Sequence, residues 1–311
     1  MTAKNTLFYP FDSQKDQYAL ALDSVQIYNG TTYTDETTDA SNTTAADVTL
    51  GNVATSEYNF GKVAGSIWGG IRGVLSTAGV AQPLTALKTF NGSTFFTETT
   101  DSNDGDSNDI TLTAGVGHIW YMGCANIWEG FRIQKNTNTA YIGGELLWEY
   151  WNGSAWNSFT PNIIFGIDTH LNNNDTTGVI NCQYNELAWD SSSLTGWAAT
   201  IVDGVNAYYI RATVVTQFTN SSGTIQSSLS YTRFWTINGK WQYFNGTNWT
   251  TFFPKNTDAF NSSASSSYFN ATTTLAAFNP YEFTGWSDTT INSIAGRYIR
   301  FVLTSDWVTA P

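Results

Sequence analysis

Short runs of alternating apolar and polar residues, separated by turn sequences, extend along this whole chain. Residues 146–151 read Leu-Leu-Trp-Glu-Tyr-Trp, and the turn sequence Asn152-Gly153 follows them directly. Asn-Gly supplies the positive φ angles that a tight hairpin turn needs. The same dipeptide follows an aromatic residue at Asn29, Asn91 and Asn245. No long stretch has the 3.6-residue period of an amphipathic helix with caps, so the pattern predicts an all-β fold.

A set of aromatic landmarks occurs twice in the second half of the chain. Residues 148–161 read WEYWNGSAWNSFTP, and residues 241–254 read WQYFNGTNWTTFFP, 93 positions later. Two further pairs of landmarks follow at an offset of 89: Gly196-Trp197 with Gly285-Trp286, and Tyr209-Ile210-Arg211 with Tyr298-Ile299-Arg300. Landmarks that recur in register indicate a duplicated β module.

The first half of the chain contains a different duplication. Residues 28–50 match residues 90–112 at an offset of 62 without a gap. Farther along, the pattern Ile-Trp-x-Gly-x-Arg begins at Ile67 and again at Ile127, 60 positions later. The chain therefore reads front half, front half, back half, back half. We predict tandem jelly-roll-like β-sandwiches built from these duplicated half-motifs.

The order of the half-motifs predicts a nested arrangement. Residues 86–221 contain one front and one back half, and are expected to form a complete sandwich. Residues 1–85 and 222–311 would then pair into a second, discontinuous sandwich, because neither piece alone can cover both faces of a sheet. The alternative is plain succession, with three sequential units over 1–85, 86–221 and 222–311.

Composition narrows the range of partners. The 311 residues carry a net charge of −12, only 12% of them are charged, and 15% are aromatic. No basic surface is available for nucleic acid, and attraction to anionic lipid is equally disfavoured. The sequence shows no apolar run long enough to span a membrane and no signal peptide at its start. We therefore expect synthesis in a cytoplasm, with no nucleic-acid or membrane partner.

Candidate catalytic groups are sparse. His118 lies in an apolar strand context, His170 lies in an asparagine-rich loop, and neither is near a nucleophile motif. Glu145 and Glu149 share a face of a predicted strand, as paired carboxylates of a glycosidase would. Their counterparts in the second copy are Asn238 and Gln242, so the pair is not a repeated feature. We predict a protein that is not an enzyme, without catalytic residues and without a cofactor.

Other polar motifs also have ordinary structural explanations. The acidic stretch 101–109 spaces carboxylates as a calcium loop would, but its glycine is misplaced and the first copy lacks most of the carboxylates. It is expected to be a solvated turn, with no metal site. The Asn-Gly-Ser/Thr sequences fit glycan acceptors, although turn chemistry already accounts for them. Cys124 and Cys182 are expected to be buried free thiols, with a single disulfide bridge as the alternative.

Tryptophans provide the remaining candidate binding residues. Ring faces of tryptophan can stack on sugars, and aromatic side chains also dominate sandwich cores. Alternation places Trp148 and Tyr150 on one face of their strand and Trp151 on the other. Arg211 and Arg300 are expected to pair with a carboxylate or a carbonyl. The candidate binding residues, on an aromatic surface or in the core, are Trp148, Trp151, Trp156, Trp241 and Trp249.

These motifs resemble a family. The string 148–156, followed by Gly196-Trp197 and then Tyr209-Ile210-Arg211, is similar to a β-sandwich module in virion proteins of tailed bacteriophages and archaeal viruses. That module tends to read W-x-Y-W-N-G-x-x-W, then G-W, then Y-W-V-R. Ile210 and Ile299 stand where the family has a second aromatic residue, and the front halves match less clearly. The family has no known catalytic residues, so the resemblance implies none.

The resemblance implies a virion structural protein, located in a virus particle. We expect a capsid or head-surface component, such as a decoration protein, because no fibre-like heptad run is present. Its partners would be copies of itself and other virion proteins. The first alternative is a tail, baseplate or fibre protein that binds host surface glycan. A glycosidase-like enzyme and a cell-surface lattice protein are the remaining alternatives.

Overall fold

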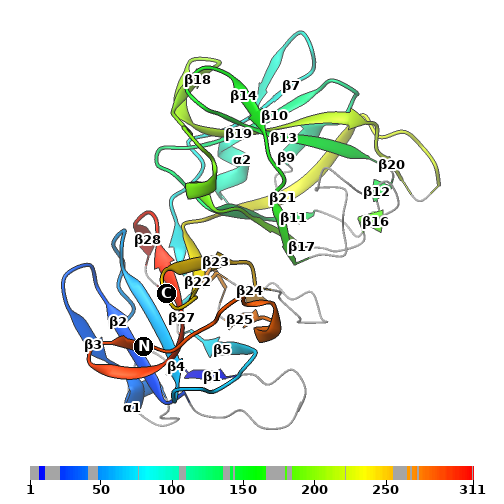
Figure 1. Ribbon diagram of the computed structural model, residues 1–311. Helices are drawn as coiled ribbons and strands as arrows, with labels where there is room; N and C mark the ends of the chain where they lie inside the picture. Colours follow the sequence, from blue (N-terminus) through cyan, green and yellow to red (C-terminus); the bar gives the residue numbers. More distant parts are fainter. Residues whose placement is uncertain are drawn as a thin grey trace. The chain divides into compact units, whose positions relative to one another are not determined.

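The computed structural model describes residues 7–10, 22–40, 48–75, 77–104, 110–135, 141–142, 144–165, 179–180, 184–220, 222–254, 265–266, 268–271, 273–309 and 311. Nearly all regular structure in these ranges is β, in sheets whose strands are antiparallel except for one short parallel pair, which confirms the predicted all-β sandwich class (Figure 1). The chain divides into two compact units. One comprises Met1–Ala81 with Asn238–Pro311, and the other Gln82–Ile237, so the second unit interrupts the first along the sequence.

The first unit contains a seven-stranded sheet and two smaller ones. The large sheet has the order β23 (Trp249–Phe252), β22 (Gly239–Phe244), β27 (Ile294–Leu303), β4 (Glu57–Lys62), β2 (Ser24–Tyr28) and β3 (Tyr33–Asp35), with β26 (Thr289–Ile291) also paired to β27. The others join β1 (Leu7–Pro10), β5 (Gly70–Val74), β25 (Thr273–Ala277) and β24 (Ser265–Ser266), and β28 (Trp307–Thr309) with β6 (Val80–Ala81). Short helices are α1 (Thr37–Ala40) and η2 (Pro280–Glu282).

The second unit repeats this plan. Its seven-stranded sheet has the order β14 (Trp156–Ser158), β13 (Glu145–Trp151), β19 (Val205–Thr216), β10 (Ile119–Cys124), β7 (Ala86–Phe90) and β8 (Phe95–Thr97), with β18 (Thr200–Val202) on β19. A five-stranded sheet joins β15 (Asn162–Phe165), β17 (Tyr184–Ala188), β11 (Gly130–Lys135), β21 (Ser228–Ile237) and β9 (Ile110–Thr113). The last sheet contains β16 (Val179–Ile180), β12 (Tyr141–Ile142) and β20 (Thr219–Asn220); the helices are α2 (Thr99–Asp104) and η1 (Ser191–Ser193).

Strand pairing in the first unit joins segments far apart in sequence. Strand β27 pairs with β4, with Arg300 opposite Asn59, and β25 pairs with β5. Front and back half-motifs thus meet within each of two sheets. The second boundary between the units lies after Ile237, whereas the half-motifs suggested residue 221. Strand β21 accounts for the difference, because it pairs with β9 and β11 of the second unit.

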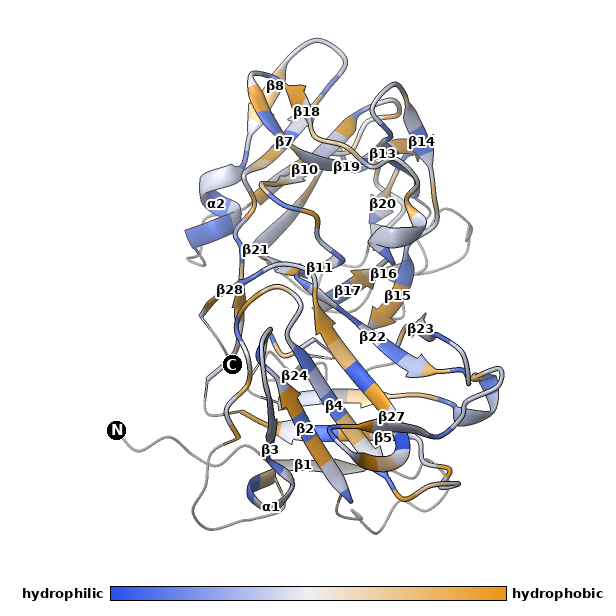
Figure 2. Ribbon diagram, turned by 60° about the vertical axis from the view of Figure 1, so that its left-hand side comes forward, coloured by the Kyte–Doolittle hydropathy of each residue, from blue (hydrophilic) through white to orange (hydrophobic). Residues whose placement is uncertain are grey.

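Alternation of side chains positions the cores. Along β19, Ile210, Ala212 and Val214 are buried in the core, while Arg211 faces the other side of the sheet. Strand β27 shows polar residues between apolar ones as blue and orange bands in Figure 2, and β22 alternates buried with half-buried residues along its length. Burying one face of each strand against a second sheet provides the main favourable term for folding.

One buried hydrogen bond is kept in both units with different residues. In the second unit the Trp120 indole donates to the Thr113 carbonyl at 2.6 Å, and Phe218 stacks on Trp120. The Tyr58 hydroxyl of the first unit donates to the Gly51 carbonyl at 2.5 Å and accepts from the Trp307 indole at 2.9 Å. Trp120 corresponds to Tyr58, and Phe218 corresponds to Trp307. Each unit therefore has one tryptophan in this pair, but at opposite positions. Such exchange conserves core volume, which cores tolerate well.

Candidate functional site

Two of the five candidate tryptophans lie in the cores. Trp148 and Trp241 are fully buried. The Trp148 ring lies 5.9 Å from the ring of Phe131, which belongs to the facing sheet. The Trp241 ring lies 5.2 Å from Phe301 and 5.6 Å from Phe269. Trp148 therefore joins the two sheets of its unit, and Trp241 lies in the core of the other unit, so a ligand cannot reach either ring in the folded protein.

The other three candidates, Trp151, Trp156 and Trp249, are half-buried on the opposite, outer faces of the large sheets. Strands β13 and β14 bring Trp151 opposite Trp156 across a hairpin, with ring centroids 5.7 Å apart. The hairpin turn forms because the Asn152 side-chain oxygen accepts backbone N–H bonds from Ser154 and Ala155. Asn-Gly turn chemistry therefore fixes the placement of this aromatic pair.

In each unit an arginine covers one face of a half-buried tryptophan ring on the outer face of the large sheet. In the second unit the guanidinium carbon of Arg211 lies 4.3 Å from the Trp156 ring centroid, and its Nε donates to Glu149 at 2.7 Å. Register explains this contact, because Glu149 lies directly opposite Arg211. Both charged side chains are mostly buried, so the ion pair and the stacked ring reinforce each other with little screening.

The first unit repeats the arginine stack with a different acid. Arg300 lies 4.1 Å from the Trp249 ring centroid, and its Nε donates to the Gln242 side chain at 3.0 Å. Its Nη1 donates to Glu57 at 2.7 Å. Gln242 stands at the position of Glu149, so the carboxylate has moved from the back half-motif to the front one. The arginine keeps a charge partner in both units, as predicted for Arg211 and Arg300.

Burial around Arg300 changes the ionisation of its neighbours. Burial lowers the pKa of the Arg300 guanidinium below its usual value, while the Glu57 carboxylate opposes that change. The Tyr33 hydroxyl donates to the other Glu57 oxygen at 3.3 Å. Burial, followed by the negative charge of Glu57, raises the pKa of Tyr33 to about 12. Tyr33 therefore keeps its proton at neutral pH and remains a hydrogen-bond donor to Glu57, which suits a structural role.

A second aromatic cluster covers the outer face of the second unit's large sheet. Tyr121 contacts the rings of Phe95, Trp156 and Tyr209 at centroid distances of 5.8, 5.8 and 6.3 Å. The Tyr209 ring lies over Gly123, where an added Cβ would approach a ring carbon to 2.6 Å. Tyr298 covers Gly61 in the first unit in the same way. These cross-strand tyrosine–glycine pairs were not predicted, although the two glycines lie one repeat apart in the sequence.

The polar candidates for catalysis are held by local structure. His118 Nδ1 accepts the Gly115 backbone N–H at 3.1 Å, and Glu145 accepts the Thr216 hydroxyl at 3.1 Å. Residues 101–104 form most of α2, while 105–109, His170 and Cys182 lie outside the described residues. Cys124 is buried and free. Among the described residues, no group of three or more histidine, cysteine or carboxylate side chains is arranged to hold a metal.

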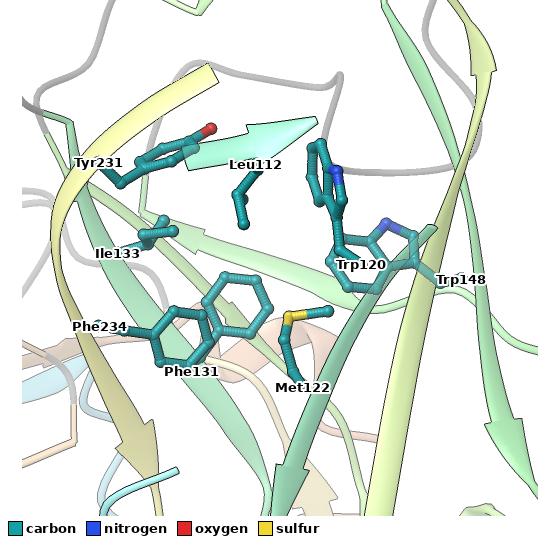
Figure 3. A pocket seen from close by; sticks show the side chains of 8 residues that line it. All are labelled: Leu112, Trp120, Met122, Phe131, Ile133, Trp148, Tyr231 and Phe234. Atoms are coloured by element: carbon teal, nitrogen blue, oxygen red, sulfur yellow. The ribbon is translucent and has the colours of Figure 1, made fainter. Parts of the chain in front are cut away.

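A small cavity of about 10 Å³ lies inside the second unit (Figure 3). Its volume is at the lower limit for one water molecule, which excludes a larger ligand. The cavity is lined by core side chains from both sheets: Leu112, Trp120, Met122, Phe131, Ile133, Trp148, Tyr231 and Phe234.

Comparisons with known proteins add no relative. No protein-family model, curated protein or solved structure matches the chain. None of the helices in the described ranges has the length and apolar character needed to cross a bilayer.

The carboxylate that pairs with the arginine comes from a different strand in each unit, Glu149 in one and Glu57 in the other, and this difference leads to a testable prediction. Replacing Glu149 with glutamine removes the carboxylate from Arg211 and should lower the free energy of unfolding by about 1.5–3 kcal/mol, the usual range for a hydrogen bond to a charged group. Ile119 stands at the position of Glu57. Adding Ile119→Glu to Glu149→Gln should therefore recover part of the loss in denaturant unfolding. A double variant that is less stable than Glu149→Gln would contradict the proposed equivalence.

Proposed function

We propose that this chain is a structural protein of a virus particle, in which rigid β-sandwiches pack against copies of themselves and other virion proteins. A capsid or head-surface role, such as decoration, is the form we favour. The supporting observation is that the repeated landmarks serve architecture: Trp148 and Trp241 are buried in the cores, while Arg211 and Arg300 cover Trp156 and Trp249. The resemblance of these same landmarks to a virion module points in the same direction.

The low charge of the chain supports assembly through broad surfaces. Only 12% of residues are charged, and interface cores are depleted of charged residues because desolvating a charge is costly. Exposed apolar side chains are present on both units, including Val63, Ile67, Ile201 and Val308, which are 59–69% exposed. Scattered apolar residues are common on any surface, and contacts between copies at these positions would bury apolar surface without desolvating a charge.

Sedimentation velocity of the purified full chain tests the proposal. Self-association through protein surfaces should shift the sedimentation coefficient upward with concentration, toward discrete assemblies. High salt should preserve these assemblies, because few charges are available for screening. A chain that remains monomeric across the whole accessible concentration range would contradict self-assembly.

A glycan-binding tail or baseplate protein is the second candidate. The observation in its favour is the half-buried aromatic group on the outer face of the second unit, with Trp151 and Trp156 side by side. Binding on a glycan array that is lost in Trp151→Ala, with folding retained, would support this function. Against it stands Arg211, which already occupies one face of the Trp156 ring.

A further inference from the structure

Strands β1 and β21 occupy the same place in the two units. Strand β11 lies between β17 and β21, and its counterpart β5 lies between β25 and β1. Register agrees residue by residue. Phe8 pairs with Gly73 and Tyr9 with Arg72. In the same way, Phe234 and Trp235 pair with the residues of β11 that correspond to Gly73 and Arg72 in the repeat.

The sequences of the two strands also match. Residues 6–9 read Thr-Leu-Phe-Tyr, and residues 232–235 read Thr-Arg-Phe-Trp. The aligned phenylalanine and the aromatic residue after it occur at equivalent register positions. The repeated module therefore contains this strand as well as the front and back halves. The position beside β5 or β11 is therefore filled by this sequence in both units, at the edge of the sheet for β1 and inside the sheet for β21.

The two strands reach that position from opposite ends of the module. Strand β21 follows the back half and comes after β20, while β1 precedes the front half. The position beside β5 or β11 thus accepts its strand independently of how the strand is connected to the rest of the module. Pairing with β5 or β11 therefore does not require that the strand be attached to a particular end of the module.

Strand β1 is also the more weakly held of the two. It has four residues and, among the described strands, pairs with β5 alone, whereas β21 has ten residues and pairs with β9 and β11. Thirteen residues, 11–23, separate β1 from β2. A chain of that length spans at most roughly 45 Å. That reach allows β1 to leave its own unit without straining β2.

We propose that β1 is exchanged between copies, so that residues 7–10 of one chain pair with β5 of a second chain. The same contacts form within one chain or between two, which makes exchange of an identical element a low-cost route to association. Reciprocal exchange closes a dimer, and one-way exchange continues from copy to copy. The inference rests on the proposed self-assembly, because it names the contact that joins the copies.

Disulfide trapping tests this exchange. Leu7 and Val74 are register partners, and Val74 is 40% exposed. Partners on antiparallel strands have the Cα spacing that a disulfide requires. Two differently tagged chains, both carrying Cys182→Ser, are co-expressed: one has Leu7→Cys and the other has Val74→Cys. After mild oxidation, exchange should give a heterodimer on a non-reducing gel that disappears with reductant.

Two controls make the result decisive. A single chain with both Leu7→Cys and Val74→Cys shows that the cysteines can bond in the native register. A pair with Val308→Cys in place of Val74→Cys reports random encounters, since Val308 is 65% exposed. Heterodimer no more abundant than with Val308→Cys, while the double variant forms its internal bond, would overturn the exchange. If the full chain still self-associates in that case, only the exchange is wrong; a monomeric chain would contradict the proposed assembly as well.

Discussion

A fragment containing residues 82–237 is expected to fold on its own, whereas a fragment containing residues 86–221 is expected to remain unfolded. The longer fragment includes all the strands of the second unit. The shorter one lacks β21, which contributes Leu229, Tyr231 and Phe234 to the core. Losing three buried side chains of this size costs more than about 5 kcal/mol, which is comparable with the whole stability of a typical domain.

Circular dichroism and denaturant unfolding distinguish the two fragments. Residues 82–237 should give a cooperative transition, and addition of the isolated β21 peptide to residues 86–221 should restore part of the ordered signal. A cooperative transition of residues 86–221 alone would show that β21 is not part of this core.

Replacing Trp148 with alanine is expected to lower the free energy of unfolding of the second unit by about 3–5 kcal/mol, as for other buried aromatic residues. Trp148 is fully buried and contacts the facing sheet through Phe131. Removing its ring opens a cavity beside the existing one, because Trp148 already lines it. This value is measured by chemical denaturation of the full chain, from the unfolding transition assigned to residues 82–237.

Trp151 provides the matched control for Trp148. It is three residues away on the same strand, but it is half-buried on the outer face. Trp151→Ala should cost about 1 kcal/mol or less, as surface substitutions usually do. Equal losses for the two variants would contradict the assignment of Trp148 to the inter-sheet core.

Much of the fold was predictable because local signals agreed. Asn-Gly turns after aromatic residues defined hairpins, and alternation along 146–151 correctly placed Trp148 and Trp151 on opposite faces. The repeats indicated which segments are equivalent. The equivalence of Tyr58 with Trp120, and of Trp307 with Phe218, was not predicted. The residue types differ at both positions, because the tryptophan is at one position in one unit and at the other position in the other.

Long-range features had no comparable signal. Strand β21 belongs to the second unit, but its counterpart in the first unit, β1, lies near the start of the sequence and on the other side of the half-motifs. The charge partner of Arg300 was equally hidden, because Glu57 lies in a different half-motif from Glu149. Strand pairing brought these residues together, and single-sequence periodicity carries no information about which strands pair.

Mass spectrometry of purified virus particles tests the central claim most directly. Particles are isolated from a culture that produces this chain, and the copy number of the chain per particle is measured alongside the unassembled fraction. A virion structural protein should co-purify with particles in a fixed, multiple-copy stoichiometry that survives high-salt washing. Particles that lack the chain, with all of it recovered in the unassembled fraction, would contradict the account.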